Sequence, residues 1–236
     1  VTKKEVYKIN KIIKNKVMKK IFLIVIAFLS IGICDMYSQV IKMEHGANLT
    51  WMDGGGYAKK RGAYSFMLGC DYLEKDWFML SSEIGYIQRG GRSLFRYTEG
   101  YDPDQGQYEY NYRRIAKLDF FQINTTFRFK HDFKHFTLFM GVGPTIDILL
   151  KDRSEWQKQP INTDQITTTE TSIHHNNVLY GLKYELGINY HINNKWNAIL
   201  NLSQLNSFKG STIGHYDGDS FRNKIATLSL GIGYRL

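Results

Sequence analysis

The strongest constraint in this sequence is an alternation of apolar and polar residues, with a period of two, that recurs along residues 40–236. In the clearest segment, Tyr, Leu and Ile occupy every second position from Tyr180 to Tyr190, and Gly, Lys, Glu and Asn stand between them. Successive side chains of a β-strand point to opposite faces, so this pattern predicts strands with one apolar and one polar face. Similar segments near 121–130 and 228–236, and weaker ones near 43–51, 62–73, 77–90, 135–150 and 195–206, bring the predicted strands to eight.

The connections between these segments alternate between short and long. The short ones lie around 74–76, 131–134 and at Asn193-Asn194, a good tight-turn pair, and the long polar ones span roughly 52–61, 91–114, 151–177 and 207–223. An antiparallel up-and-down meander with tight turns at one end and displayed loops at the other has this spacing. Transmembrane β-barrels show the same asymmetry.

The size of the side chains on the two faces indicates which face points outward. The apolar face is large and aromatic, whereas the other mixes Gly, Asn, Ser, Thr and charged residues, which suit the narrow, filled lumen of an eight-stranded barrel. We therefore expect an all-β protein, an eight-stranded antiparallel up-and-down transmembrane β-barrel, with Tyr and Trp as interfacial girdles. The mean hydropathy of −0.36 excludes a polytopic helical membrane protein. A soluble exported barrel that binds a small apolar ligand is an alternative, and it would turn the apolar face inward.

The basic end of the chain predicts export. Eight Lys stand against two acidic residues in residues 1–39, so this segment carries +6 of the formal charge of +9. Met18-Lys19-Lys20 precedes a 13-residue apolar run, Ile21 to Ile33, which suits a signal peptide and is too short for a membrane-spanning helix. We predict a presequence over residues 1–39, with cleavage near Ser38 and with residues 1–17 as a misassigned start.

Removal of this presequence changes what the composition implies. The predicted mature chain, residues 40–236, keeps a charge of only about +3, so no nucleic-acid partner is expected. It also keeps one cysteine, Cys70, which excludes an intramolecular disulfide.

Several motifs carry a family resemblance over most of residues 43–236. They are Ser82-Glu83-Ile84-Gly85-Tyr86-Ile87-Gln88-Arg89-Gly90, Leu118-Asp119-Phe120-Phe121-Gln122-Ile123, Gly141-Val142-Gly143-Pro144 and the ending Leu230-Gly231-Ile232-Gly233-Tyr234-Arg235-Leu236. On these segments the chain resembles the PorT-like outer-membrane β-barrel family of Gram-negative bacteria. The resemblance implies an eight-stranded outer-membrane barrel, a role connected with protein secretion, and no catalytic residue set.

Charged residues on the polar face are the candidate site. We predict that six of them face the lumen as a structural charge network: Asp71, Glu83, Arg128, Asp147, Lys183 and Glu185. An unpaired charge in a dry lumen is costly, so one hypothesis pairs Asp147 with Lys183. The other hypothesis places these two residues in a wet lumen mouth, where water solvates them.

Other motifs offer weaker chemistry. His174-His175, with Asp164 and Glu170 upstream, lack the further ligands that a metal site needs, and no metal or cofactor is expected. Ser172 stands beside these histidines, which leaves an outer-membrane lipid-modifying enzyme as an alternative function.

Two features bear on the strands themselves. Pro144 cannot donate to a strand ladder, so a bulge or bend is expected there. The Tyr-rich segment 97–112 either extends the sheet above the membrane or forms a contact surface.

These patterns together predict a non-enzymatic protein of a Gram-negative outer membrane. Its expected partners are outer-membrane lipid, the barrel-assembly machinery and a protein bound through the extracellular loops. Its expected role is structural or interactive, linked to protein secretion or surface assembly.

Overall fold

The computed structural model describes residues 39–53, 57, 59–102, 106–161, 164–171, 177–208, 211–212 and 220–236. Gln39–Leu236 form one compact unit. Residues 1–38, which hold almost all of the predicted presequence, lie outside the described residues, so the signal peptide and its cleavage site stay predictions.

The described part of this unit is built from β-strands. They are β1 (Val40–Asp53), β2 (Arg61–Tyr72), β3 (Phe78–Arg92), β4 (Arg96–Asp102), β5 (Gly106–Asp132), β6 (Phe136–Pro160), β7 (Thr167–Thr171), β8 (Val178–His191), β9 (Trp196–Ser207), β10 (Ser211–Thr212) and β11 (Ser220–Arg235). No helix among the described residues is long and apolar enough to cross a membrane.

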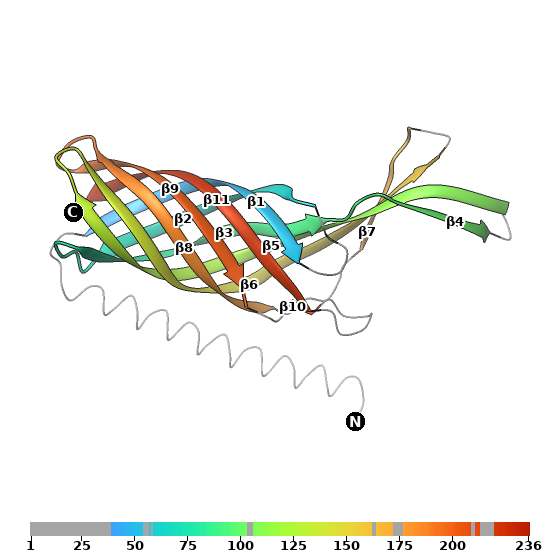
Figure 1. Ribbon diagram of the computed structural model, residues 1–236, viewed down its shortest axis with the longest axis horizontal. Coiled ribbons are helices and arrows are strands. Elements are labelled where there is room, and N and C mark those ends of the chain that lie inside the picture. Colours follow the sequence, from blue (N-terminus) through green and yellow to red (C-terminus); the bar gives the residue numbers. More distant parts are fainter. Residues whose placement is uncertain are drawn as a thin grey trace, which may run out of the picture. The chain divides into compact units, whose positions relative to one another are not determined.

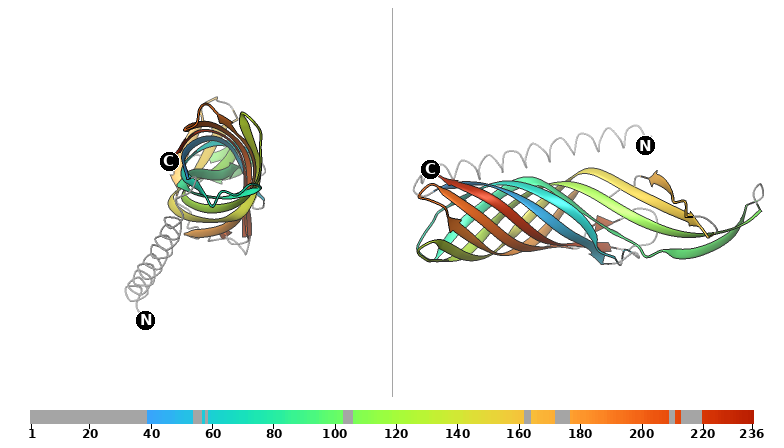
Figure 2. Two further views of the ribbon diagram at one scale, coloured as in Figure 1. Left: turned by 90° about the vertical axis from the view of Figure 1, so that its left-hand side faces the viewer. Right: turned by 90° about the horizontal axis from the view of Figure 1, so that it is seen from above.

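Eight of these strands close into a ring. Each pairs antiparallel with its neighbours in the order β1-β2-β3-β5-β6-β8-β9-β11, and β11 pairs back onto β1 from Val40↔Arg235 to Asp53↔Arg222. The strands run diagonally around the wall, and the ring is seen end-on in the left view of Figure 2 (Figures 1 and 2). The prediction of an eight-stranded antiparallel up-and-down barrel is confirmed.

The two ends of the barrel differ, as the spacing of the segments predicts. The turn end carries the short β2–β3, β5–β6 and β8–β9 connections. The first and last described residues also meet there, where the Leu236 backbone N–H donates to the Gln39 carbonyl. In the β8–β9 turn, the Asn193 side-chain oxygen accepts from the backbone N–H groups of Lys195 and Trp196 at 2.8 Å. Such side-chain bonds to the backbone explain why Asn favours tight turns. The opposite end carries the longer connections and is called the loop end below.

Strands β5 and β6 continue far beyond the ring at the loop end. Their distal parts pair with each other from Tyr110↔Pro160 to Ala116↔Ser154, and β4 and β7 add one strand on each side, with Gly106–Tyr112 pairing with β4. We call this four-stranded sheet, in the order β4-β5-β6-β7, the extension (Figure 1).

The extension corrects part of the expected loop pattern. Much of 91–114 and 151–177 was expected to be loop, and the described residues there are largely strand. These strands have polar residues on both faces because neither face is buried in the barrel, so the apolar alternation that marks the wall is absent. For its described residues, the Tyr-rich segment does extend the sheet above the barrel.

Pro144 interrupts one ladder without shifting it. The β5–β6 register is the same on both sides of the gap, from Asn124↔Thr145 to Phe127↔Val142, while Pro144 itself pairs with Leu182 on β8. The register shift between these strands lies instead at Asp119/Phe120. The expected bulge is therefore not at Pro144, because the proline lacks only the one N–H that the β5 side would have received.

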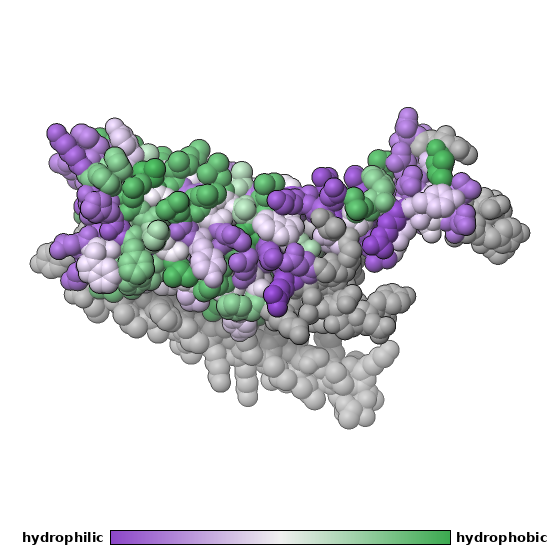
Figure 3. All heavy atoms as spheres, in the orientation of Figure 1, coloured by the Kyte–Doolittle hydropathy of each residue, from purple (hydrophilic) through white to green (hydrophobic). Residues whose placement is uncertain are grey.

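Large apolar side chains cover the outside of the ring. On β11, Leu228, Leu230 and Ile232 are 53%, 66% and 49% exposed. The same outward positions on other strands hold Ile41, Met43, Leu49, Phe66, Leu68, Ile84, Phe129, Leu138, Met140, Val142, Leu186, Ile188, Leu200 and Leu202. Hydrophobic surface gathers over the barrel strands in Figure 3, and hydrophilic surface at the turn end and on the extension. A soluble barrel has the reverse polarity, so this wall is that of a membrane-spanning barrel.

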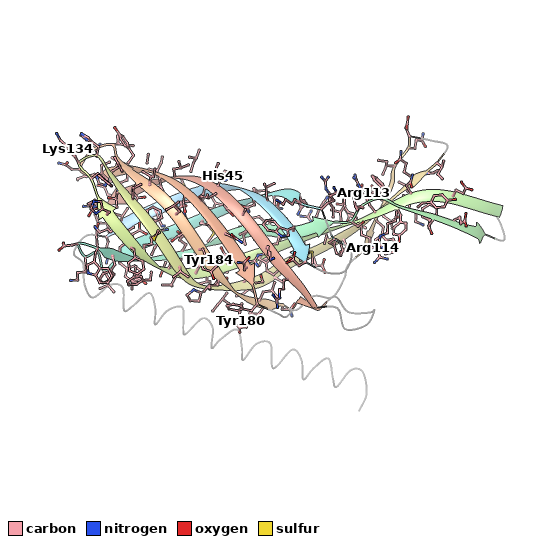
Figure 4. The ribbon with its side chains drawn as sticks, in the orientation of Figure 1. His45, Arg113, Arg114, Lys134, Tyr180 and Tyr184 are labelled. Carbon is pink, nitrogen blue, oxygen red and sulfur yellow. The ribbon has the colours of Figure 1, made fainter. Side chains whose placement is uncertain are left out.

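Aromatic rings gather near both edges of this apolar belt. Toward the turn end, Trp77 lies 5.9 Å from Phe129 between ring centroids, and Trp196 lies 4.9 Å from Tyr234. Toward the loop end, the rings of Tyr64 and Tyr86 lie 5.4 Å apart, and Tyr180 points outward from β8 (Figure 4). Amphipathic rings at two levels match the interfacial girdles of membrane barrels.

Strands β5 and β6 approach closely at Gly143, and this contact can be tested by substitution. A Cβ at this position would lie 1.9 Å from the Thr125 carbonyl oxygen, so Gly143→Ala must push β5 and β6 apart. We expect it to destabilise the barrel by about 1–3 kcal/mol or more, measured as the folded fraction in denaturant titrations. Gly62→Ala is the control, because a Cβ there meets nothing within 4 Å. Equal stability of the two variants would contradict the close contact.

Candidate functional site

The structure places all six residues of the predicted charge network inside the barrel. Asp71, Glu83, Arg128, Asp147, Lys183 and Glu185 are each at most 6% exposed. They come from β2, β3, β5, β6 and β8, and each occupies an inward position of its strand. The inward positions also hold many neutral polar side chains, such as Asn124, Thr126 and Asn201.

Arg128 joins three strands to β5. Its Nε donates to Glu185 Oε1 at 2.6 Å and its Nη2 to Glu185 Oε2 at 3.0 Å, so the guanidinium holds this carboxylate with two hydrogen bonds. Its Nη1 reaches Asp71 Oδ1 and its Nη2 reaches Glu83 Oε1, both at 3.2 Å. The group also lies 4.3 Å from the ring centroid of Phe139. A planar guanidinium with five donors suits a buried position among several carboxylates.

Glu83 is the carboxylate that contacts several cations, as Arg128 is the cation that contacts several carboxylates. Its Oε1 accepts from Lys42 Nζ at 2.5 Å, and its Oε2 accepts from Lys183 Nζ at 2.6 Å and from Asn124 Nδ2 at 3.2 Å. Lys183 also lies 3.0 Å from Glu185 Oε2. Strands β3 and β8, which are not neighbours in the ring, are therefore joined across the lumen.

Lys42 and Glu44 on β1 also belong to this cluster, although they are not among the six predicted residues. Lys42 Nζ lies 3.1 Å from Glu44 Oε1 and 3.3 Å from Asp71 Oδ1. Glu44 Oε2 accepts from Ser229 Oγ at 2.7 Å. The signal that could have found both was present, because they stand at alternate positions of the same polar face as Gly46 and Asn48.

We call these seven side chains the lumen cluster. It consists of Lys42, Arg128 and Lys183 with Glu44, Asp71, Glu83 and Glu185. Three cations face four carboxylates, so the charges nearly cancel. Such pairing is what makes a charged interior tolerable, because an isolated buried charge costs several kcal/mol.

Asp147 is not part of the lumen cluster, and its predicted pairing with Lys183 is wrong. Its Oδ2 lies 2.5 Å from Arg89 Nη2, and its Oδ1 accepts from Gln122 Nε2 at 2.7 Å. Arg89 also donates from Nη1 to Ser207 Oγ at 2.7 Å. Arg89 is not among the predicted residues, and it lies on β3 toward the loop end, within a run of buried residues where the alternation of burial is lost.

The strand register explains this correction. On β6 and β8, Asp147 pairs with Leu179 and Lys183 pairs with Gly143, so the two charges lie four residues apart along the strands. At about 3.4 Å per residue this separates them by roughly 14 Å, and each charge finds a nearer partner on another strand. Depth in the wall cannot be deduced from sequence position alone because the strands are staggered.

Apolar side chains fill the lumen beside the Arg89–Asp147 pair. Six of them form a buried layer: Ile87, Leu118, Phe120, Leu179, Leu205 and Ile225. Between this layer and the lumen cluster lies a cavity of about 30 Å³, lined by Glu44, Glu83, Lys183, Asn201 and other residues. A volume of this size holds about two water molecules, so the interior here is packed.

Buried residues also lie toward the loop end of the lumen. Met52, Tyr57 and Ala116 form a small buried cluster there. Burial raises the pKa of the Tyr57 hydroxyl above its ordinary value, and the nearby positive charge of Arg114 opposes this shift. Arg114 thus lies near the mouth, at the base of the extension.

This arrangement ties the wall together through paired charges. Each carboxylate of the lumen cluster lies within ion-pair distance of at least one cation. Among the described residues, no group of three or more His, Cys, Asp or Glu could hold a metal ion. Of the residues considered for a metal or an enzyme, Ser172, His174 and His175 lie outside the described residues. Asp164 and Glu170 are exposed.

Only solved structures match this chain in the comparisons with known proteins. No family model matches the chain, and no curated protein matches it. Among solved structures, the chain is similar to Neisserial surface protein A, at 9% identity over 85% of this chain and 99% of that one, with a TM-score of 0.47. It is also similar to the attachment invasion locus protein Ail of Yersinia pestis, at 12% identity, 84% and 98% coverage and a TM-score of 0.43. The outer membrane protein OprG of Pseudomonas aeruginosa matches at 10% identity, 85% and 97% coverage and a TM-score of 0.41.

The substitution Arg128→Met tests how much the lumen cluster contributes to the stability of the barrel. The change leaves the carboxylates of Asp71, Glu83 and Glu185 without their shared cation, and we expect a loss of about 3–5 kcal/mol in the free energy of unfolding. The measurement is denaturant unfolding of the barrel in detergent micelles. Lys224→Met, which removes an ion pair to Asp53 at half-exposed positions, serves as the control and should cost about 1 kcal/mol or less. Similar losses for both variants would contradict a central role of Arg128.

Proposed function

We propose that this protein is a non-enzymatic outer-membrane barrel whose role is carried by the part outside the membrane. The observation that supports this most directly is the contrast between the wall and the lumen. Outward positions are apolar and exposed, whereas the interior is filled by paired charges, amides and a layer of apolar side chains. A barrel with this polarity belongs in lipid, and a filled lumen leaves its outer surface to interact with other molecules.

The proposed location is the outer membrane of a Gram-negative bacterium. The turn end then faces the periplasm, and the loop end with the extension faces outward, as in barrels with short periplasmic turns and long extracellular loops. The partners that follow are outer-membrane lipid around the belt, the barrel-assembly machinery during insertion, and a molecule bound at the extension.

The finer proposal concerns the family. The motifs Ser82–Gly90, Leu118–Ile123, Gly141–Pro144 and Leu230–Leu236 favour membership of the PorT-like outer-membrane barrels and, with it, a role in protein secretion or surface assembly. Several residues of these motifs make specific contacts in the barrel. Glu83 and Arg89 bind charged partners in the lumen, and Gly143 permits the close approach of β5 and β6.

Membrane fractionation tests the location. We expect the protein in the outer-membrane fraction, extracted only by detergent, because the belt exposes Leu, Ile and Phe around the whole ring. An unboiled sample should migrate differently from a boiled one on a denaturing gel, since a closed barrel resists unfolding by detergent alone. Recovery in the soluble fraction, or identical migration with and without boiling, would overturn the proposal.

Conductance in planar bilayers tests whether the lumen is closed. The lumen cluster and the layer around Phe120 fill the barrel, so we expect no steady pore current from the purified protein. A wide porin of known conductance, inserted under the same conditions, is the positive control. A steady current from this protein that scales with salt concentration would show an open path and place the function in the lumen.

A further inference from the structure

The two faces of the extension carry opposite charges. Side chains alternate between faces along each strand, and Arg113 and Arg114 leave β5 on opposite sides (Figure 4). Among the side chains that the structure describes, the cationic face, which continues the inner face of the barrel wall, carries Arg96, Thr98, Tyr110, Tyr112, Arg114, Trp156, Lys158, Thr167 and Thr169. The other face carries Glu99, Glu109, Glu155 and Glu170 with Arg113.

The cationic face is organised in rows that cross the strands. Arg96 on β4 pairs with Tyr112 on β5, Tyr112 pairs with Lys158 on β6, and Lys158 pairs with Thr167 on β7. Neighbouring strands lie about 4.8 Å apart, so two cations flank one tyrosine ring at a spacing of roughly 10 Å. The next row places Arg114 beside Trp156 and Thr169.

The aromatic rings of this face form a platform. Tyr112 and Trp156 are nearly parallel, with an interplanar angle of 14° and 6.2 Å between centroids. Arg114 lies 4.2 Å from the Trp156 centroid, and Lys158 Nζ lies 5.1 Å from that of Tyr110. These contacts hold the cations against the rings before any ligand binds, which lowers the entropy lost on binding.

Among the described residues, the carboxylates of the acidic face have more partners than the cations of the cationic face. On the acidic face, Glu155 forms an ion pair with Lys117, and Glu99 accepts from the Tyr97 hydroxyl at 3.0 Å. Within the described part of the chain, no ion pair joins Arg96, Arg114 or Lys158 to a carboxylate. The carboxylate nearest along that face is Asp152, nearer the mouth on β6.

We propose that the cationic face binds an acidic polysaccharide at the cell surface. Sugar rings present flat C–H faces that stack on Tyr112 and Trp156, their carboxylate or ester anions pair with Arg96, Arg114 and Lys158, and their hydroxyls reach the threonines at the sides. Tyr, Trp and Arg are also the residues that most often carry binding energy at interfaces. The inference rests on the proposed function in one respect only, namely that the extension faces outward.

Binding of a defined polyuronate to the full barrel in detergent or nanodiscs tests the inference. The probe is a polygalacturonate oligomer, and its methyl ester, which keeps the rings and loses the charge, should bind at least about tenfold more weakly. Polyglutamate of the same charge, which lacks sugar rings, should also bind at least about tenfold more weakly. Affinity should fall with added salt, because the contacts are charged.

Matched variants locate the surface. Trp156→Ala should weaken polygalacturonate binding about tenfold, whereas Tyr97→Ala, an aromatic change on the opposite face, should change it less than twofold. Arg96→Ser with Lys158→Ser should abolish binding, whereas Lys75→Ser with Lys134→Ser, the same loss of charge at the turn end, should not. Heat-modifiable migration of each variant checks that the barrel is folded.

Each other outcome overturns the inference. Equal binding of polyglutamate and polygalacturonate would show attraction by charge alone, and tighter binding of oligothymidylate would show a surface for single-stranded nucleic acid. If the folded barrel does not bind polygalacturonate, the proposed site does not exist. These results are separate from the proposed function, because the barrel can be located in the outer membrane and bind no polyuronate, or bind it in detergent and lie elsewhere in the cell.

Discussion

The structure depends on the requirement that backbone N–H and C=O groups be paired where no water can reach them. Within hydrocarbon, a sheet meets this requirement only by closing, and β11 returns to β1 along the whole of Val40–Asp53 to do so. Closure sets the remaining properties of the wall. One face of every strand must be acceptable to lipid, and the other must fit a lumen only as wide as eight strands allow.

That narrow lumen explains the character of the interior. Side chains from all sides of the ring meet there, and charged groups can be held only if each finds a partner of opposite sign. Arg128 and Glu83 provide this from β5 and β3, and they reach strands that are not their hydrogen-bonding neighbours, such as β8. The lumen cluster therefore links strands across the interior of the ring. The apolar layer around Phe120 excludes water from the lumen on the loop side of this cluster.

The extension shows what strands do once they leave this constraint. Beyond the ring, β5 and β6 need not present one face to lipid, and both of their faces become polar. The inner face of the wall continues outward as a surface with Arg114, Tyr112 and Lys158, and the outer face continues as an acidic one with Glu109 and Glu155. The two faces of the extension therefore differ in the sign of their charge, whereas the two faces of the barrel wall differ in hydrophobicity.

The sequence by itself determined which residues alternate, where the tight turns fall and which face is bulky, because these are local properties read at a period of two. Eight strands, their antiparallel order and the inward position of Glu83, Arg128 and Glu185 follow from it. The sequence leaves the extension open between loop and strand, because strands without a buried face lack the apolar signal. Only the tertiary structure decided that Asp147 meets Arg89 rather than Lys183, and that Lys42 and Glu44 join the lumen cluster. Partners across a barrel depend on the stagger of strands far apart in the chain, and that stagger is settled by closure of the ring.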